Sequence, residues 1–103
     1  MQRSVGISLA NFENRLIFLT GGAFMNKKKR VISPTVLMFH IMSGTCSEGK
    51  PMKVARYHHG STVLGLKLYV YGGLKIKAES SHIEILALPA NNQTQWQQVF
   101  IAG

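Results

Sequence analysis

The side chains that could carry out acid–base, nucleophilic or metal chemistry in this chain are few. Its 103 residues include four carboxylates, four histidines and a single cysteine. General acid–base catalysis needs positioned partners, and Glu84, as one carboxylate without a partner, is a poor catalytic candidate. A cysteine-based zinc site needs several thiolates, and an internal disulfide needs two cysteines. The composition therefore predicts no disulfide, no cofactor and no metal.

The histidines and the cysteine do not form a recognisable site. His58 and His59 are adjacent, so on a strand they would point to opposite faces and could not share a metal ion. His40 and His82 fall in corresponding strands, but not at the spacing of metal ligands. Cys46 has no triad-like partners, and we expect it to be a small buried apolar residue. No catalytic residue is predicted.

Positive charge is the strongest chemical signal in the sequence. Twelve Lys and Arg against four acidic residues give a formal charge of +8, which favours an acidic partner or serves only solubility. If the loops at 23–30 and 74–80 lie at the same edge of the molecule, their cations would form one surface that faces a partner. The candidate partner-binding residues are Lys27, Lys28, Lys29, Arg30, Lys75 and Lys77. We favour an acidic protein surface over nucleic acid, which would be released steeply by salt.

The elements that would position these residues repeat along the chain. Residues 15–22 (RLIFLTGG) and residues 66–73 (LKLYVYGG) each place an aliphatic residue before an aromatic one and end in two glycines. Glycine is disfavoured inside strands, so each pair marks a tight bend or a close approach of backbone. The two segments lie about 50 residues apart, a spacing typical of β-propeller blades.

The segments around each glycine pair complete a four-stranded pattern. Two apolar stretches joined by a polar turn precede each pair, which is the signature of a β-hairpin. A variable polar loop follows, at 23–30 and at 74–80, and then a third strand at 35–41 and at 82–88. A fourth strand begins near Thr45 in the first unit and at Trp96 in the second. The fold prediction is all-β: two four-stranded antiparallel units, with no helical periodicity to compete.

The second unit resembles a kelch repeat. That repeat has an Arg and a His before its first strand, an aromatic before a double glycine, a Glu in strand three and a Trp at strand four. The residues that carry the resemblance across both units are Gly21, Gly22, Arg56, Tyr69, Gly72, Gly73, Glu84 and Trp96. The resemblance covers two repeats, repeat 1 at 3–50 and repeat 2 at 51–101. Repeat 1 is degenerate, because Thr45 and Cys46 stand where the Trp is expected and the strand-three Glu is missing.

The resemblance implies two kelch-type blades of an incomplete β-propeller. Kelch propellers contain more than two blades, so further blades would come from a longer chain, of which this one is a fragment, or from self-association; we favour the fragment. Tyr69 and Trp96 would then pack between blades, and Glu84 would be a structural hydrogen-bond acceptor. The implied function is non-enzymatic: a module that presents inter-strand loops to a protein partner.

An enzyme of the galactose-oxidase type is the alternative that the same resemblance allows. It would hold copper with Tyr and His ligands and cross-link a Tyr to a Cys, but Cys46 has no Tyr in an obvious site beside it. The longest apolar run, at 31–42, is too short to span a bilayer, and the N-terminal stretch lacks an unbroken apolar region. We therefore expect no membrane association, and favour an intracellular, cytoplasmic location.

Overall fold

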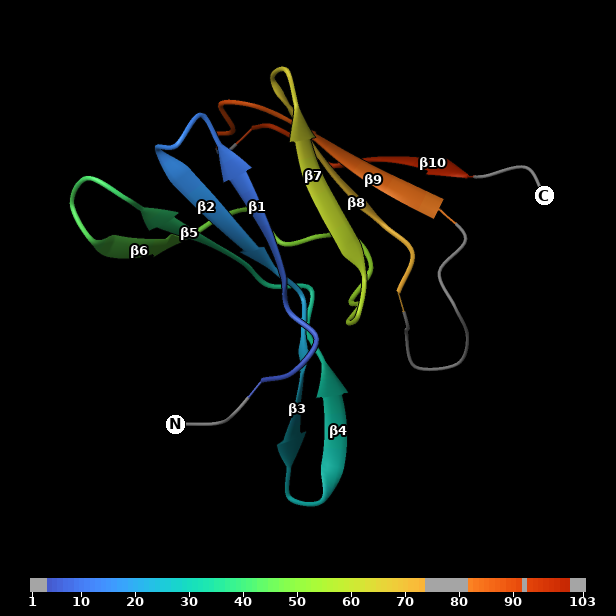
Figure 1. The fold of residues 1–103 in the computed structure, drawn as a ribbon. Coiled ribbons are helices and arrows are strands. Elements are labelled where there is room, and N and C mark those ends of the chain that lie inside the picture. The colour runs from blue at the N-terminus through green and yellow to red at the C-terminus, as the bar shows by residue number, and fades with distance from the viewer. Residues whose placement is uncertain (1–3, 74–81, 92, 101–103) are drawn as a thin grey trace.

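The computed structural model describes residues 4–73, 82–91 and 93–100, and all regular secondary structure in these ranges is β (Figure 1). The all-β prediction is confirmed. Lys75, Lys77 and the loop expected at 74–80 lie outside the described residues. In the described ranges, no helix is long and apolar enough to cross a membrane.

Eight of the strands form two antiparallel sheets of the same design. Sheet 1 has the order β1 (Ser8–Phe12), β2 (Leu16–Thr20), β5 (Val36–His40) and β6 (Thr45–Glu48). Sheet 2 has the order β7 (Gly60–Leu64), β8 (Lys67–Tyr71), β9 (His82–Ala87) and β10 (Gln97–Phe100). In each sheet the first two strands form a tight hairpin, and the glycine pair directly follows the second strand.

The segment after the first glycine pair is a third β unit, and the prediction of a polar loop at 23–30 is wrong. β3 (Ala23–Asn26) pairs with β4 (Lys29–Ile32). Phe24 lies opposite Val31, an aromatic–aliphatic cross-strand pair of the kind that stabilises sheets. The φ angles of Lys27 and Lys28 are 51° and 67°, as a two-residue type I′ turn requires. This turn was missed because it contains neither Asn nor Gly.

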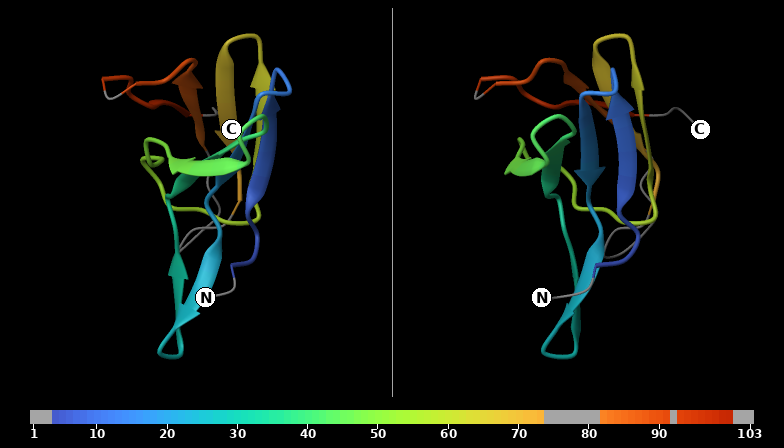
Figure 2. Two further views of the ribbon diagram at one scale, coloured as in Figure 1. Left: turned by 90° about the vertical axis from the view of Figure 1, so that its left-hand side faces the viewer. Right: turned by 60° about the vertical axis from the view of Figure 1, so that its left-hand side comes forward.

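The two sheets meet along their first strands and spread apart at their last ones. β1 and β7 lie side by side in Figures 1 and 2, while β6 and β10 form opposite outer edges. The hydroxyl oxygens of Ser8 on β1 and Ser61 on β7 are 2.5 Å apart and share a hydrogen bond. The β3–β4 hairpin projects away from both sheets.

One apolar core fills the wedge between the sheets. Sheet 1 contributes Phe18 and Val36, and sheet 2 contributes Leu68 and Leu86. Trp96, which precedes β10, is buried beside them, and its indole N–H donates to the carbonyl oxygen of Lys50 at 2.9 Å. Burial of each large apolar side chain stabilises the fold by about 1.5–3 kcal/mol, so this shared core holds the two sheets in one body.

Candidate functional site

The connection between the sheets, residues 49–59, contains the densest polar network that the structure describes. Arg56 Nη2 lies 2.7 Å from Glu84 Oε2, and neither side chain has any exposed surface. The Glu84 carboxylate also accepts hydrogen bonds from the backbone amides of Lys53 at 2.6 Å and Val54 at 3.0 Å. Glu84 therefore fastens the connection to β9, and its carboxylate faces protein groups rather than solvent.

The glycine pairs allow the connection to pass close to both sheets. Gly21 and Gly73 have φ angles of 69° and 83°, which favour glycine. A Cβ atom on Gly21 would collide with the carbonyl oxygen of Arg56, and one on Gly73 would lie 2.6 Å from the Cβ of His59. The amide of Gly22 donates to the same Arg56 carbonyl at 3.0 Å. One glycine of each pair thus provides the space that the connection needs.

His59 sits between these glycines and pairs with a residue that the sequence analysis did not single out. Its Nε2 atom is 2.7 Å from Thr20 Oγ1. Burial, then the charges of Arg56 and His58, lower the pKa of His59 to about 4. The ring is therefore neutral at physiological pH. A hydroxyl beside a neutral imidazole resembles a nucleophile–base pair, but Thr20 has no exposed surface, so no substrate can reach it in this conformation.

The remaining histidine and cysteine candidates do not join this site. His58 is exposed, with its ring 4.9 Å from that of Tyr57, whereas the adjacent His59 is buried. Cys46 is exposed, so the prediction of a buried cysteine is wrong; β6 is an edge strand, and all four of its residues are exposed. Among the described residues, no three His, Cys, Asp or Glu side chains gather as they would around a metal ion.

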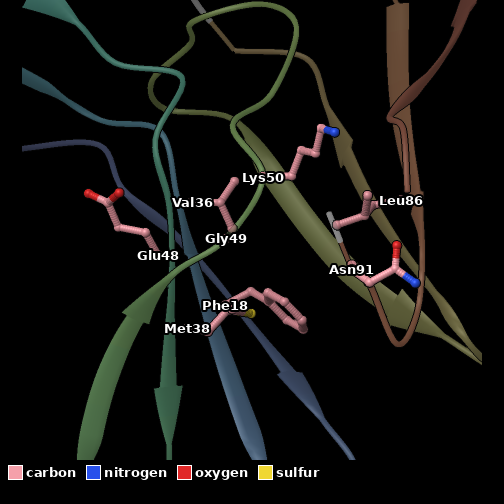
Figure 3. A pocket seen from close by; sticks show the side chains of 9 residues that line it. Phe18, Val36, Met38, Glu48, Gly49, Lys50, Leu86 and Asn91 are labelled. Carbon is pink, nitrogen blue, oxygen red and sulfur yellow. The ribbon is translucent and has the colours of Figure 1, made fainter. Parts of the chain in front are cut away.

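A pocket of about 310 Å³ lies between the two sheets and is lined by residues of both (Figure 3). Phe18 and Met38 lie on one side of it, and Leu86 and Asn91 lie on the other. Lys50 and Asn91 provide polar groups at its margin, whereas the carboxylate of Glu48 points away from Phe18 and Leu86. This lining could hold a small amphipathic group. The lining side chains do not include a serine, threonine, cysteine or histidine that could act as a nucleophile.

The basic cluster lies on the projecting hairpin, and the structure makes it a defined surface. Lys27 and Lys28 form the turn, while Lys29 and Arg30 begin β4, and all four are exposed. The guanidinium of Arg30 donates to the hydroxyl of Tyr57 at 3.1 Å and lies 5.7 Å from the centre of its ring. Tyr57 is buried, so it anchors the Arg30 side chain. We call these four residues the basic hairpin surface.

An apolar side chain completes this surface. Met25 lies directly opposite Arg30 in the β3–β4 register, and 55% of it is exposed. Residues 15–47 contain no carboxylate at all, so no acidic neighbour along this stretch neutralises the cations. Exposed Met and Arg side chains are enriched in protein interfaces.

Comparison with family models and with curated proteins identified no relative of this chain. No protein-family model matches the chain, and no curated protein matches it either.

Proposed function

We propose that this chain is a non-enzymatic protein-interaction module made of two kelch-type β-propeller blades. The basic hairpin surface contacts an acidic surface of a protein partner. The observation that carries the proposal is the cluster of four exposed cations on a hairpin that projects from a packed two-sheet body. Loops and hairpins on a rigid scaffold are the usual places for binding residues.

The arrangement of the sheets supports the propeller part of this proposal. Both sheets have four antiparallel strands in chain order, and their first strands lie side by side, as the inner strands of neighbouring blades would. Arg56, Glu84 and Trp96 carry the kelch resemblance; Arg56 lies in the connection between the sheets, and Glu84 and Trp96 of sheet 2 bond to residues of that connection. In this proposal their role is to hold one blade against the next.

The electrostatics of the hairpin determine what kind of partner it suits. Each exposed ion pair contributes only about 0.2–1 kcal/mol, so the main effect of four cations is to steer an acidic surface into place. The apolar Met25 and the anchored Arg30 then provide contact area beside the charges. A protein is favoured over nucleic acid because this surface combines apolar and cationic groups, whereas backbone binding of nucleic acid relies on charge.

The test uses poly-L-glutamate as an acidic probe and single-stranded DNA as a comparison, with binding measured by fluorescence anisotropy at low and high salt. The test variant is Lys27→Glu with Lys28→Glu. The matched control is Arg15→Glu with Lys53→Glu, which changes the net charge equally at two exposed positions elsewhere. We expect the hairpin variant to weaken polyglutamate binding about tenfold or more, equivalent to about 1.4 kcal/mol.

Two outcomes would overturn the proposal. An equal loss in the control variant would mean that net charge alone attracts the probe. Tighter binding of DNA than of polyglutamate, lost in the hairpin variant, would identify the surface as a nucleic-acid site instead.

A further inference from the structure

The face of sheet 1 that points away from the core is apolar. Because side chains alternate along a strand, the residues between the core positions share this face. In register, Leu9 lies opposite Leu19 and Leu19 opposite Leu37, while Ile17 lies opposite Phe39. Leu9 is 62% exposed, and none of the other four is fully buried. We call these five residues face A.

The outward face of sheet 2 is also apolar and carries two tyrosines. Tyr69 lies opposite Ile85, and Tyr71 lies opposite Ile83, which in turn lies opposite Val99. Tyr71 is 42% exposed and Val99 is 46% exposed. The ring of Tyr71 lies against Gly60 and occupies the space that a side chain at this position would fill. We call these five residues face B.

Each open face is the counterpart of a face that is already buried inside the chain. Counted back from the glycine pairs, Ile17 and Leu19 of face A occupy the positions of Leu68 and Val70 in sheet 2. Leu68 and Val70 are completely buried against sheet 1. Face A therefore presents the kind of surface that sheet 2 uses to pack on sheet 1.

The same counting relates face B to the buried face of sheet 1. Tyr69 and Tyr71 occupy the positions of Phe18 and Thr20, which are 1% and 0% exposed. Ile83 likewise corresponds to the buried Val36, since each lies opposite the residue that precedes its glycine pair. Faces A and B thus resemble the two halves of the internal interface, placed on opposite sides of the molecule.

We infer that a second copy of this chain covers these faces, with face A of one copy packed on face B of the next in the manner of sheet 1 and sheet 2. Within the strands, the charged residue beside face A is Glu48 and the one beside face B is Lys67, which have opposite signs. The contact is heterologous, so repetition closes a ring or extends a chain of copies. This inference rests on the sheet faces and is independent of the proposed role of the basic hairpin surface.

Light scattering after size exclusion tests the inference over a range of protein concentrations at low and high salt. Leu9→Glu places a charge on face A and Val99→Glu places one on face B; both positions are exposed, so the fold should tolerate the change. The control is Met42→Glu, at a turn residue that is 93% exposed and belongs to neither face. The fluorescence of Trp96 reports whether each variant remains folded.

We expect the wild-type chain and Met42→Glu to form a ring or a concentration-dependent series of oligomers. High salt should strengthen association, because it screens the repulsion between chains of charge +8. Leu9→Glu and Val99→Glu should each abolish the oligomers seen with the wild type. An equimolar mixture of these two variants should form a heterodimer, since it retains one intact face A and one intact face B.

The inference is overturned if the wild type stays monomeric at every concentration, which would assign these faces to some other occupant. It is also overturned if only one of the two variants blocks association, because that result indicates a symmetric contact of one face with itself. Neither result depends on polyglutamate binding, so failure here is distinct from failure of the proposed function.

Discussion

The guanidinium of Arg56 and the carboxylate of Glu84 meet at 2.7 Å in an environment from which solvent is excluded. Arg56 lies in the connection between the sheets and Glu84 lies on β9, so this pair fastens the connection to sheet 2. Removal of one member of a buried ion pair leaves an uncompensated charge, which is more damaging than the pair itself is stabilising. A single substitution of Arg56 or Glu84 should therefore loosen the connection from sheet 2.

Glu84→Gln should lower the free energy of unfolding by about 3–5 kcal/mol, because Arg56 would keep its charge without a counter-ion. Urea denaturation followed by Trp96 fluorescence measures the change. Glu48→Gln is the control, at an exposed carboxylate whose replacement should change stability by less than about 0.5 kcal/mol. Equal effects of the two substitutions would contradict this account of the pair.

Gly72 and Gly73 allow the cost of backbone strain to be measured apart from the cost of steric overlap. Gly72→Ala should cost about 1–2 kcal/mol, since its φ is 68° and no atom outside its neighbours lies within 4 Å of the added Cβ. Gly73→Ala should cost clearly more, because the added Cβ would also press on His59 and on the carbonyl oxygen of Tyr57. Thermal and urea denaturation of both variants compare the costs; similar values would show that His59 moves aside freely.

Acid should destabilise the fold through His59. Its pKa is about 4 in the folded chain and about 6.5 when unfolded, so the unfolded state binds more protons between these values. Stability from the neutral ring is fully present above pH 6.5 and is lost as the pH falls toward 4, by about 3 kcal/mol in all. The measurement is the free energy of unfolding at a series of pH values.

The variants for this pH series are His59→Gln and His40→Gln. The first should remove most of the slope between pH 6.5 and 4, because the titrating group is gone. The second, at a histidine bonded to Ser47 near the surface, should keep the slope. An unchanged slope in His59→Gln would assign the acid sensitivity to another group.

Tyr57→Phe tests whether the anchoring of Arg30 contributes to binding. The substitution removes the hydroxyl that accepts the 3.1 Å hydrogen bond from Arg30 and leaves the ring beneath the guanidinium. This hydrogen bond holds the Arg30 side chain in place. Its loss, at a cost of about 0.5–1 kcal/mol in binding free energy, should weaken polyglutamate binding about two- to fivefold. Tyr71→Phe, on β8, should leave this affinity unchanged. A Tyr57→Phe affinity equal to the wild type would show that Arg30 binds without its anchor.

Local patterns in the sequence were sufficient to predict the strands of both sheets. The repeated apolar segments that end in a glycine pair located β2 and β8, and the corresponding apolar segments after the following loops located β5 and β9. The β3–β4 hairpin was missed because its turn is made by Lys27 and Lys28 rather than by Asn or Gly. There the pairing of Phe24 with Val31 outweighs turn propensity.

The candidate site was predicted less completely, because its contacts join residues that are distant in the chain. The basic cluster was visible as a run of charge, but not as a hairpin anchored on Tyr57. Thr20 carried no signal, since its role depends on His59, 39 residues away. The exposure of Cys46 depends on β6 being an edge strand, which strand order decides and residue type does not.

The sequence by itself determined the all-β class, the two four-stranded units, the chain positions of their strands and the concentration of positive charge near residue 28. These are local properties, since periodicity, glycine placement and charge are read over a few neighbouring residues. Only the tertiary structure decided that Gly21 and Gly73 flank His59, that the basic residues project on a hairpin, and which face of each sheet is covered. Alternation assigns two faces to every strand, but only the packing of sheet 1 on sheet 2 selects the face that is buried.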